Sequence, residues 1–177
     1  MSLIVSDHEH NEDTVTEEEL VKILESNLTR LLQWISEAEA RVSLVLGLDT
    51  AMLGALAVFA PSPKVWTLSA AALAAVAIAF LSLSLVFLAT ASFPRTTGPK
   101  QSMIYFGGIA SRDLDQFVAD TKSLTTAQYL DDLARQCHRN GHIAASKFEW
   151  LKRAQIALFL AISPWTLSLF LLYQIRP

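Results

Sequence analysis

Charged residues are missing from long parts of this chain, and these gaps define its class. No residue between Val65 and Phe93 is charged, and the apolar stretches 42–60 and 154–175 together hold one charge, Asp49. Each stretch is about as long as a helix needs to cross a hydrocarbon layer of roughly 30 Å. With 52% hydrophobic residues in 177, the sequence predicts an all-α integral membrane protein with three transmembrane helices, at 42–60, 65–93 and 154–175.

Basic residues are scarce before the first apolar run, which follows an acidic stretch, DHEHNED. We therefore expect no cleaved signal peptide. Nine of the lysines and arginines fall in 94–153. Because such residues stay on the cytoplasmic side of short connections, we expect a multi-pass protein with its N-terminus and 94–153 in the cytoplasm. Cysteine is limited to Cys137, which excludes an intramolecular disulfide and agrees with a reducing compartment.

The cytoplasmic part begins with an acidic tail, 1–15, that we expect to be disordered. Thr16 and Glu19 form a capping-box pattern that predicts the start of a helix over 16–41. Its apolar stripe repeats at spacings of three and four: Leu24, Leu28, Leu31, Ile35, Ala38 and Val42. The stripe runs into the first apolar segment, so we expect one continuous helix.

A second stripe lies in the cytoplasmic segment 94–153, after a capping-box pattern at Thr125 and Gln128. Its members are Leu130, Ala134, Cys137, Gly141, Ala144, Phe148 and Leu151. It also runs into an apolar segment, so two transmembrane helices are expected to be continuous with long cytoplasmic helices that lie parallel as stalks. Gly141 predicts a close approach of two backbones.

The remainder of the cytoplasmic segment connects the second apolar run with the second stalk. MIYFGGIAS is predicted to be a short extended piece bent at Gly107 and Gly108, followed by a short helix near 112–123. We expect this part to pack along both stalks and to form the only compact cytoplasmic body.

Catalytic motifs are absent: the sequence has no P-loop, GxSxG or HExxH. The short cytoplasmic part leaves little room for a catalytic fold, so we expect no enzyme and no cofactor. His138 and His142 have the spacing of a shared metal site, but lack an obvious third ligand. A solvated helix face is favoured, and no metal is expected. Cys137 lies on the apolar stripe, where a buried inert thiol is the favoured interpretation.

Two weak patterns suggest a ligand. Arg135, His138, Arg139 and His142 form a polar stripe that suits either a phosphate or anionic lipid, or plain solvent. The segment 105–108, YFGG, suits either a base and phosphate or a turn that packs its aromatic rings into the stalks. A further set of basic residues near the apolar boundary is predicted to anchor the chain at lipid headgroups: Lys147, Lys152 and Arg153.

Within the apolar segments, Gly47, Ala51 and Gly54 place small residues on one helix face, which favours a homo-oligomer. Asp49 costs on the order of 3 kcal/mol at such a depth and must face protein or water. Two settings are open for it: contact with a serine or threonine of a neighbouring helix, or the wall of a water path in an oligomer. Pro164 predicts a kink in the third membrane helix.

Three stretches together resemble a known family: NLTRLLQWISEAEARVSLVLGLDTAMLG, YFGGIAS, and QCHRNGHIAASKFEWLKRA. Their order and their placement against the apolar runs resemble the transmembrane effectors of Pycsar, the bacterial anti-phage systems that signal through cyclic pyrimidine mononucleotides. The resemblance implies an inner-membrane antiviral defence protein that senses cyclic UMP or cyclic CMP from a partner pyrimidine cyclase and impairs the lipid bilayer. No nucleic-acid partner is expected.

Because the chain shows no β-rich cyclic-nucleotide domain, any nucleotide site must be built from helices and the 102–112 segment. We expect one group of side chains at the phosphate or the pyrimidine edge, and another to stack on the base: Arg112, Arg135, Arg139 and Asn140 for the first, Tyr105 or Phe106 for the second. Two other functions stay open, a constitutive membrane scaffold and a holin-like channel without nucleotide control.

Overall fold

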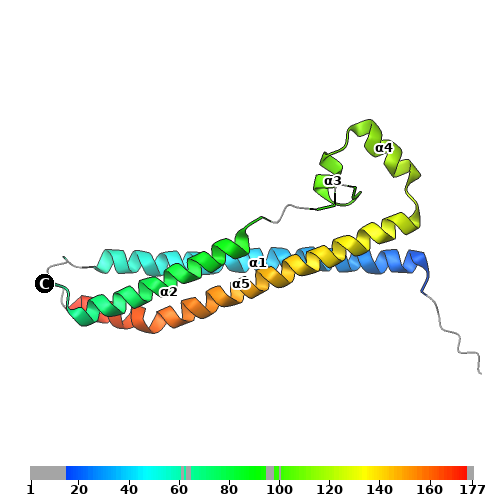
Figure 1. Cartoon of the computed structure of the whole chain (residues 1–177). Coiled ribbons are helices and arrows are strands. Elements are labelled where there is room, and N and C mark those ends of the chain that lie inside the picture. Colours follow the sequence, from blue (N-terminus) through cyan, green and yellow to red (C-terminus); the bar gives the residue numbers. More distant parts are fainter. Residues whose placement is uncertain (1–14, 61, 63–64, 95–97, 100, 175–177) are drawn as a thin grey trace, which may run out of the picture.

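The computed structural model describes residues 15–60, 62, 65–94, 98–99 and 101–174, and these residues form helices and connections without a strand (Figure 1). The elements are α1 (Glu17–Phe59), α2 (Leu68–Ser92), α3 (Phe106–Ala110), α4 (Leu114–Ser123) and α5 (Thr126–Gln174). The all-α prediction is confirmed. The expected acidic tail up to residue 14, and residues 61, 63 and 64 of the PSPK connection, lie outside the described residues.

The two longest described helices are α1 with 43 residues and α5 with 49 residues. Both expected capping boxes are present: Thr16 and Glu19 exchange hydrogen bonds before α1, and Thr125 and Gln128 do so before α5. The two helices run side by side in the same direction (Figure 1). Each continues from a polar half into an apolar half without a break, and α5 passes through Pro164.

The third long helix, α2, runs back along the apolar halves of α1 and α5 and completes a three-helix bundle (Figure 1). Small and branched side chains fill its interior, among them Val45, Ala77, Leu81 and Leu158. All three helices are long and apolar enough to cross a membrane. Large apolar side chains also cover the outside of the bundle, as expected for a surface that faces lipid.

The apolar stripe of α1 is confirmed, because its members Leu24, Leu28, Leu31 and Ile35 are half-buried and Ala38 and Val42 are buried. The stripe of α5 is confirmed except at one position, because its other members are half-buried or buried: Leu130, Cys137, Gly141, Ala144, Phe148 and Leu151. Ala134 is exposed, whereas Leu133, Gln136 and Lys147 are buried. This stretch of α5 contacts the loop before α3 and the end of α2 as well as α1, so its buried face includes polar side chains.

Gly141 does not mark a close approach, because, apart from the adjacent turns of α5 itself, no described atom lies within 4 Å of the position a Cβ would take. The expected extended piece at MIYFGGIAS is also wrong: a hydrogen-bonded helical turn, α3, occupies Phe106–Ala110. None of the ten residues of α4, all described, is buried. The α3–α4 segment therefore stands away from the stalks (Figure 1), which differs from the expected packing along both of them.

Candidate ligand pocket and helix junction

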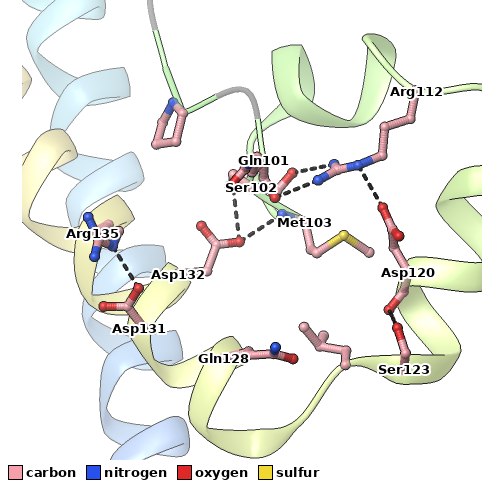
Figure 2. A pocket seen from close by; sticks show the side chains of 12 residues that line it. Gln101, Ser102, Met103, Arg112, Asp120, Ser123, Gln128, Asp131, Asp132 and Arg135 are labelled. Carbon is pink, nitrogen blue, oxygen red and sulfur yellow. Dashed lines mark hydrogen bonds and ion pairs between the residues drawn. The ribbon is translucent and has the colours of Figure 1, made fainter.

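A pocket opens between the loop before α3, the end of α4 and the first turns of α5 (Figure 2). Its volume is about 530 Å³, within the range of small-molecule sites. Polar and charged side chains make up most of its lining, which comprises Pro99, Gln101, Ser102, Met103, Arg112, Asp120, Ser123, Leu124, Gln128, Asp131, Asp132 and Arg135. The pocket therefore suits a polar ligand of the size of a mononucleotide.

Ser102 is the centre of the hydrogen bonds that form this pocket. Its buried hydroxyl donates to Asp132 Oδ2 at 3.0 Å and accepts from the Tyr105 amide at 2.9 Å and from Gln136 Nε2 at 3.1 Å. Asp132 also accepts from the Met103 amide at 2.7 Å. Two polar side chains of α5, Asp132 and Gln136, thus hold the loop. They supply partners to a stretch whose backbone amides lack helical or sheet partners.

Arg112 fixes the other side of the loop (Figure 2). Its Nη1 donates to the carbonyls of Ser102 at 2.9 Å and Gly108 at 3.1 Å, and Nη2 donates to the Gln101 carbonyl. Its Nε pairs with Asp120 at 3.0 Å, and only 10% of the side chain is exposed. The fork of the guanidinium thus joins the loop, α3 and α4, so the structure gives Arg112 a scaffold role beside its place in the lining.

Side chains larger than hydrogen would clash at both glycines of the YFGG segment, Gly107 and Gly108. A Cβ on Gly108 would lie 2.5 Å from the Ser102 carbonyl oxygen, and one on Gly107 would lie 2.5 Å from Tyr105 Cε1. The Tyr105 ring also lies against Gly98. These contacts agree with the expected alternative of an aromatic turn, although the ring packs within the turn and not between the stalks.

Arg135 lies on the α5 wall of the pocket and pairs with Asp131, with Nε 2.7 Å from Oδ2. Both side chains are about two-thirds exposed. An exposed ion pair contributes little to stability, because water and salt compete for both groups. A phosphate can therefore replace Asp131 at Arg135 far more easily than it can displace the partners of Arg112.

Three other expected site residues come together beside the pocket. The rings of Tyr105 and Phe106 lie 4.7 Å apart, and the Arg139 guanidinium lies 6.0 Å from the centre of the Tyr105 ring. Asn140, one turn further along α5 than Gln136, donates to the Gln136 carbonyl at 2.9 Å. The expected residues thus form two groups. Arg112 and Arg135 line the pocket, whereas Arg139 of α5 lies close to Tyr105 and Phe106 at the start of α3. Asn140 belongs to neither group.

Four residues that build the pocket were not predicted from the sequence: Ser102, Asp120, Asp132 and Gln136. No motif marks the first three. The burial of Gln136 could have been predicted from helical spacing. It lies three residues after Leu133 and eight before Ala144, which places all three on one face of the helix.

Between the pocket and the apolar bundle, a buried lysine joins all three long helices. Lys147 Nζ donates to the carbonyl of Ala91 at 3.0 Å and pairs with Glu39 at 3.2 Å. Ala91 lies in the last turn of α2, where carbonyls lack helical partners. The prediction that Lys147 anchors lipid headgroups was wrong, since only 8% of its side chain is exposed. We call this contact the Lys147 junction.

Deeper in the bundle, Asp49 is completely buried and lies 2.6 Å from the Ser84 hydroxyl. This is the first of its two expected settings, contact with a serine of a neighbouring helix. The small residues Gly47, Ala51 and Gly54 lie on an exposed face of α1, with no described atom near the Cβ positions of the two glycines. Asp49 and the small-residue face therefore point in different directions.

Comparison with known proteins identifies the family of this chain. No curated protein and no solved structure matches the chain. A family model described as the Pycsar effector protein domain matches residues 23–174, from the start of α1 to the end of α5. The matched region contains the pocket, the Lys147 junction and all three apolar segments. The chain therefore belongs to the Pycsar effector protein domain family and is an effector of anti-phage defence.

Proposed function

We propose that this protein is a ligand-gated effector that binds cyclic UMP or cyclic CMP at the pocket and then impairs the bacterial inner membrane. One observation carries the proposal. The helix that lines the pocket with Gln128 and Arg135 is the helix that crosses the apolar bundle, since α5 is unbroken from Thr126 to Gln174. A change at the pocket thus reaches the apolar segment without an intervening linker.

The cyclic phosphate is assigned to Arg135. Its guanidinium is exposed and exchanges a weak carboxylate partner for a phosphate with little loss. Arg139 follows it by one turn of α5 and supplies a second positive charge. Arg112 keeps its four partners and holds the loop in place while the ligand binds.

The pyrimidine is assigned to the polar wall of the pocket and to the nearby aromatic rings. Gln101 offers a donor and an acceptor, and Gln128, whose Oε1 already accepts from the Thr125 amide, offers its Nε2 as a donor to the edge of uracil or cytosine. Phe106 has 64% of its surface exposed and offers a face for stacking. Gln101 and Phe106 lie at opposite ends of the same short loop, so one ligand that contacts both can order that loop.

A ligand shifts an equilibrium only if it binds the two arrangements differently. A ligand that bridges Arg135 of α5 and Gln101 of the loop changes how α5 contacts the loop, and in the sequence this loop follows α2. The Lys147 junction holds that end of α2 against α1 and α5. We propose that ligand binding loosens this junction and lets the apolar helices rearrange, with the exposed face at Gly47, Ala51 and Gly54 available for self-association in the membrane.

Titration of the purified full chain in lipid nanodiscs tests the ligand directly. Isothermal titration calorimetry with cyclic UMP and cyclic CMP is expected to give saturable heat for at least one of them. Cyclic AMP, with the same phosphate and a larger base, is the control for specificity. No heat with either pyrimidine at millimolar concentration, from protein that is helical by circular dichroism, contradicts the proposal.

A further inference from the structure

A carboxyl group lies completely inside the apolar bundle, remote from the pocket and from the Lys147 junction. Asp49 of α1 and Ser84 of α2 are both 0% exposed. Ser84 Oγ lies 2.6 Å from Asp49 Oδ2 and 3.1 Å from the backbone carbonyl oxygen of Ala154 in α5. One serine hydroxyl thus lies between an acid of the first helix and a carbonyl of the third.

The number of hydrogens available to these oxygens decides the state of the acid. Ser84 has one hydroxyl hydrogen, which can serve either the carboxyl or the Ala154 carbonyl but not both. Asp49 Oδ1 has no hydrogen-bond partner among the described residues. An ionised Asp49 would therefore hold its charge with at most one hydrogen bond in an apolar interior, which is strongly unfavourable.

A proton on Asp49 Oδ2 allows both hydrogen bonds to form at once. Asp49 then donates to Ser84, and Ser84 donates to Ala154, so every hydrogen has an acceptor. The distance of 2.6 Å between Oδ2 and Oγ is typical of a strong O–H···O hydrogen bond. The proton thereby links α1, α2 and α5 through two consecutive hydrogen bonds.

No neighbouring charge offers another solution. The described residues of α2, Leu68–Ser92, include no charged residue, and α1 has none within a turn of Asp49. On α5 the nearest are Lys152 and Arg153, both exposed, and Arg153 pairs with Glu149 at 3.1 Å. The ion pairs between described residues do not include Asp49.

We propose that Asp49 and Ser84 form a proton-binding site inside the bundle, and that its proton is released to water when the three helices separate. The step is a simple ionisation, in which the Oδ2–H bond of the carboxylic acid breaks and leaves a carboxylate and a hydrated proton. The packed bundle binds the proton and the separated helices release it. By linkage, a fall in pH favours the packed arrangement and a rise favours separation.

Infrared spectroscopy of the full chain in lipid, without any nucleotide, tests this site. The wild-type protein at neutral pH is expected to show the carbonyl stretch of a neutral carboxylic acid. Asp49→Asn removes that band and keeps the fold, because the amide also donates to Ser84. Ser84→Ala shifts the band, since the acid loses its acceptor. A wild-type spectrum without the band, from protein with full helical content, shows that Asp49 is ionised and overturns the proposal.

Thermal unfolding gives an independent measurement. As pH rises above neutral, the melting temperature of the wild type is expected to fall more steeply than that of Asp49→Asn, which carries no titratable group at this position. Equal slopes contradict the coupling between the proton and helix packing. Because neither measurement uses a nucleotide, this proposal can fail while the ligand-gated function stands, and the reverse.

Discussion

At the scale of single residues, two arginines that look alike in the sequence have different partners in the structure. Arg112 is nearly buried and donates to backbone carbonyls of three residues besides its pair with Asp120. Arg135 has one exposed partner, Asp131. Burial and partner count, which the sequence does not show, separate the arginine that holds the loop from the one that is available to a ligand.

Arg112→Ala is expected to release the loop before α3. Hydrogen bonds to a charged group contribute about 1.5–3 kcal/mol each, so the variant should lose several kcal/mol of local stability. Hydrogen exchange of the amides at Met103 and Tyr105 measures this loss as faster exchange. Lys122→Ala, which removes an exposed basic residue of α4, is the matched control, and equal protection in both variants contradicts the scaffold role.

Arg135→Ala is expected to leave helicity and melting temperature unchanged, because its ion pair is exposed. Its affinity for cyclic UMP or cyclic CMP should fall roughly tenfold or more, the effect of losing about 1.4 kcal/mol of binding free energy. Calorimetric titration of the variant beside the wild type measures both affinities. Unchanged affinity removes Arg135 from the proposed site.

Cys137 is expected to react slowly with thiol reagents. Burial raises the pKa of its thiol, and Sγ lies 3.3 Å from the Leu24 carbonyl. A raised pKa lowers the thiolate fraction at neutral pH, and the thiolate is the reactive form. Labelling with a chromogenic disulfide reagent is expected to be much slower in the folded than in the denatured chain, and to speed up as pH rises. Equal rates contradict the partial burial of this thiol.

At the scale of elements, the sequence predicts what local chemistry decides. The capping boxes at Thr16 and Thr125 and the apolar stripe of α1 were predicted correctly, because each depends on residues within a few turns. The buried face of α5 was predicted only in part, because two of its buried residues, Gln136 and Lys147, have partners 34 and 56 positions away in the chain. Contacts at such separations follow from the fold and not from periodicity.

Two glycines give a matched pair of predictions. Gly141→Ala is expected to stabilise α5 by about 1 kcal/mol, since the new methyl group meets no described atom beyond the adjacent turns of α5 and alanine is the better helix former. Gly108→Ala is expected to destabilise α3, because its methyl group would lie 2.5 Å from the Ser102 carbonyl oxygen. Melting temperatures followed by circular dichroism and hydrogen exchange of α3 distinguish them, and the same sign for both contradicts this account.

At the scale of the whole molecule, the central feature is that pocket, Lys147 junction and apolar bundle lie in sequence along one helix. Lys147→Met keeps the length of the side chain and removes its bonds to Ala91 and Glu39. We expect the variant to bind nucleotide more tightly than the wild type, because the ligand no longer has to loosen the junction, while its effect on the membrane no longer depends on nucleotide. Unchanged nucleotide dependence shows that the junction does not couple the two parts.

The three long apolar helices and their order followed from the sequence, because length and hydropathy determine which segments can cross a membrane. The pocket did not, since it depends on where the α3–α4 segment is held. Ser102 and Asp132 are 30 positions apart, and the segment between them was expected to pack along the stalks. A few polar contacts determine its position, and these leave no periodic pattern.

Membrane potential in living cells tests the central claim most directly. Bacteria that express the chain are compared with and without a source of cyclic UMP or cyclic CMP, with Arg135→Ala and Lys122→Ala as the matched variants. The account predicts loss of potential only when the nucleotide is present, for the wild type and Lys122→Ala but not for Arg135→Ala. Loss without nucleotide indicates a holin-like channel, and no loss in either condition indicates a scaffold; either result contradicts nucleotide gating.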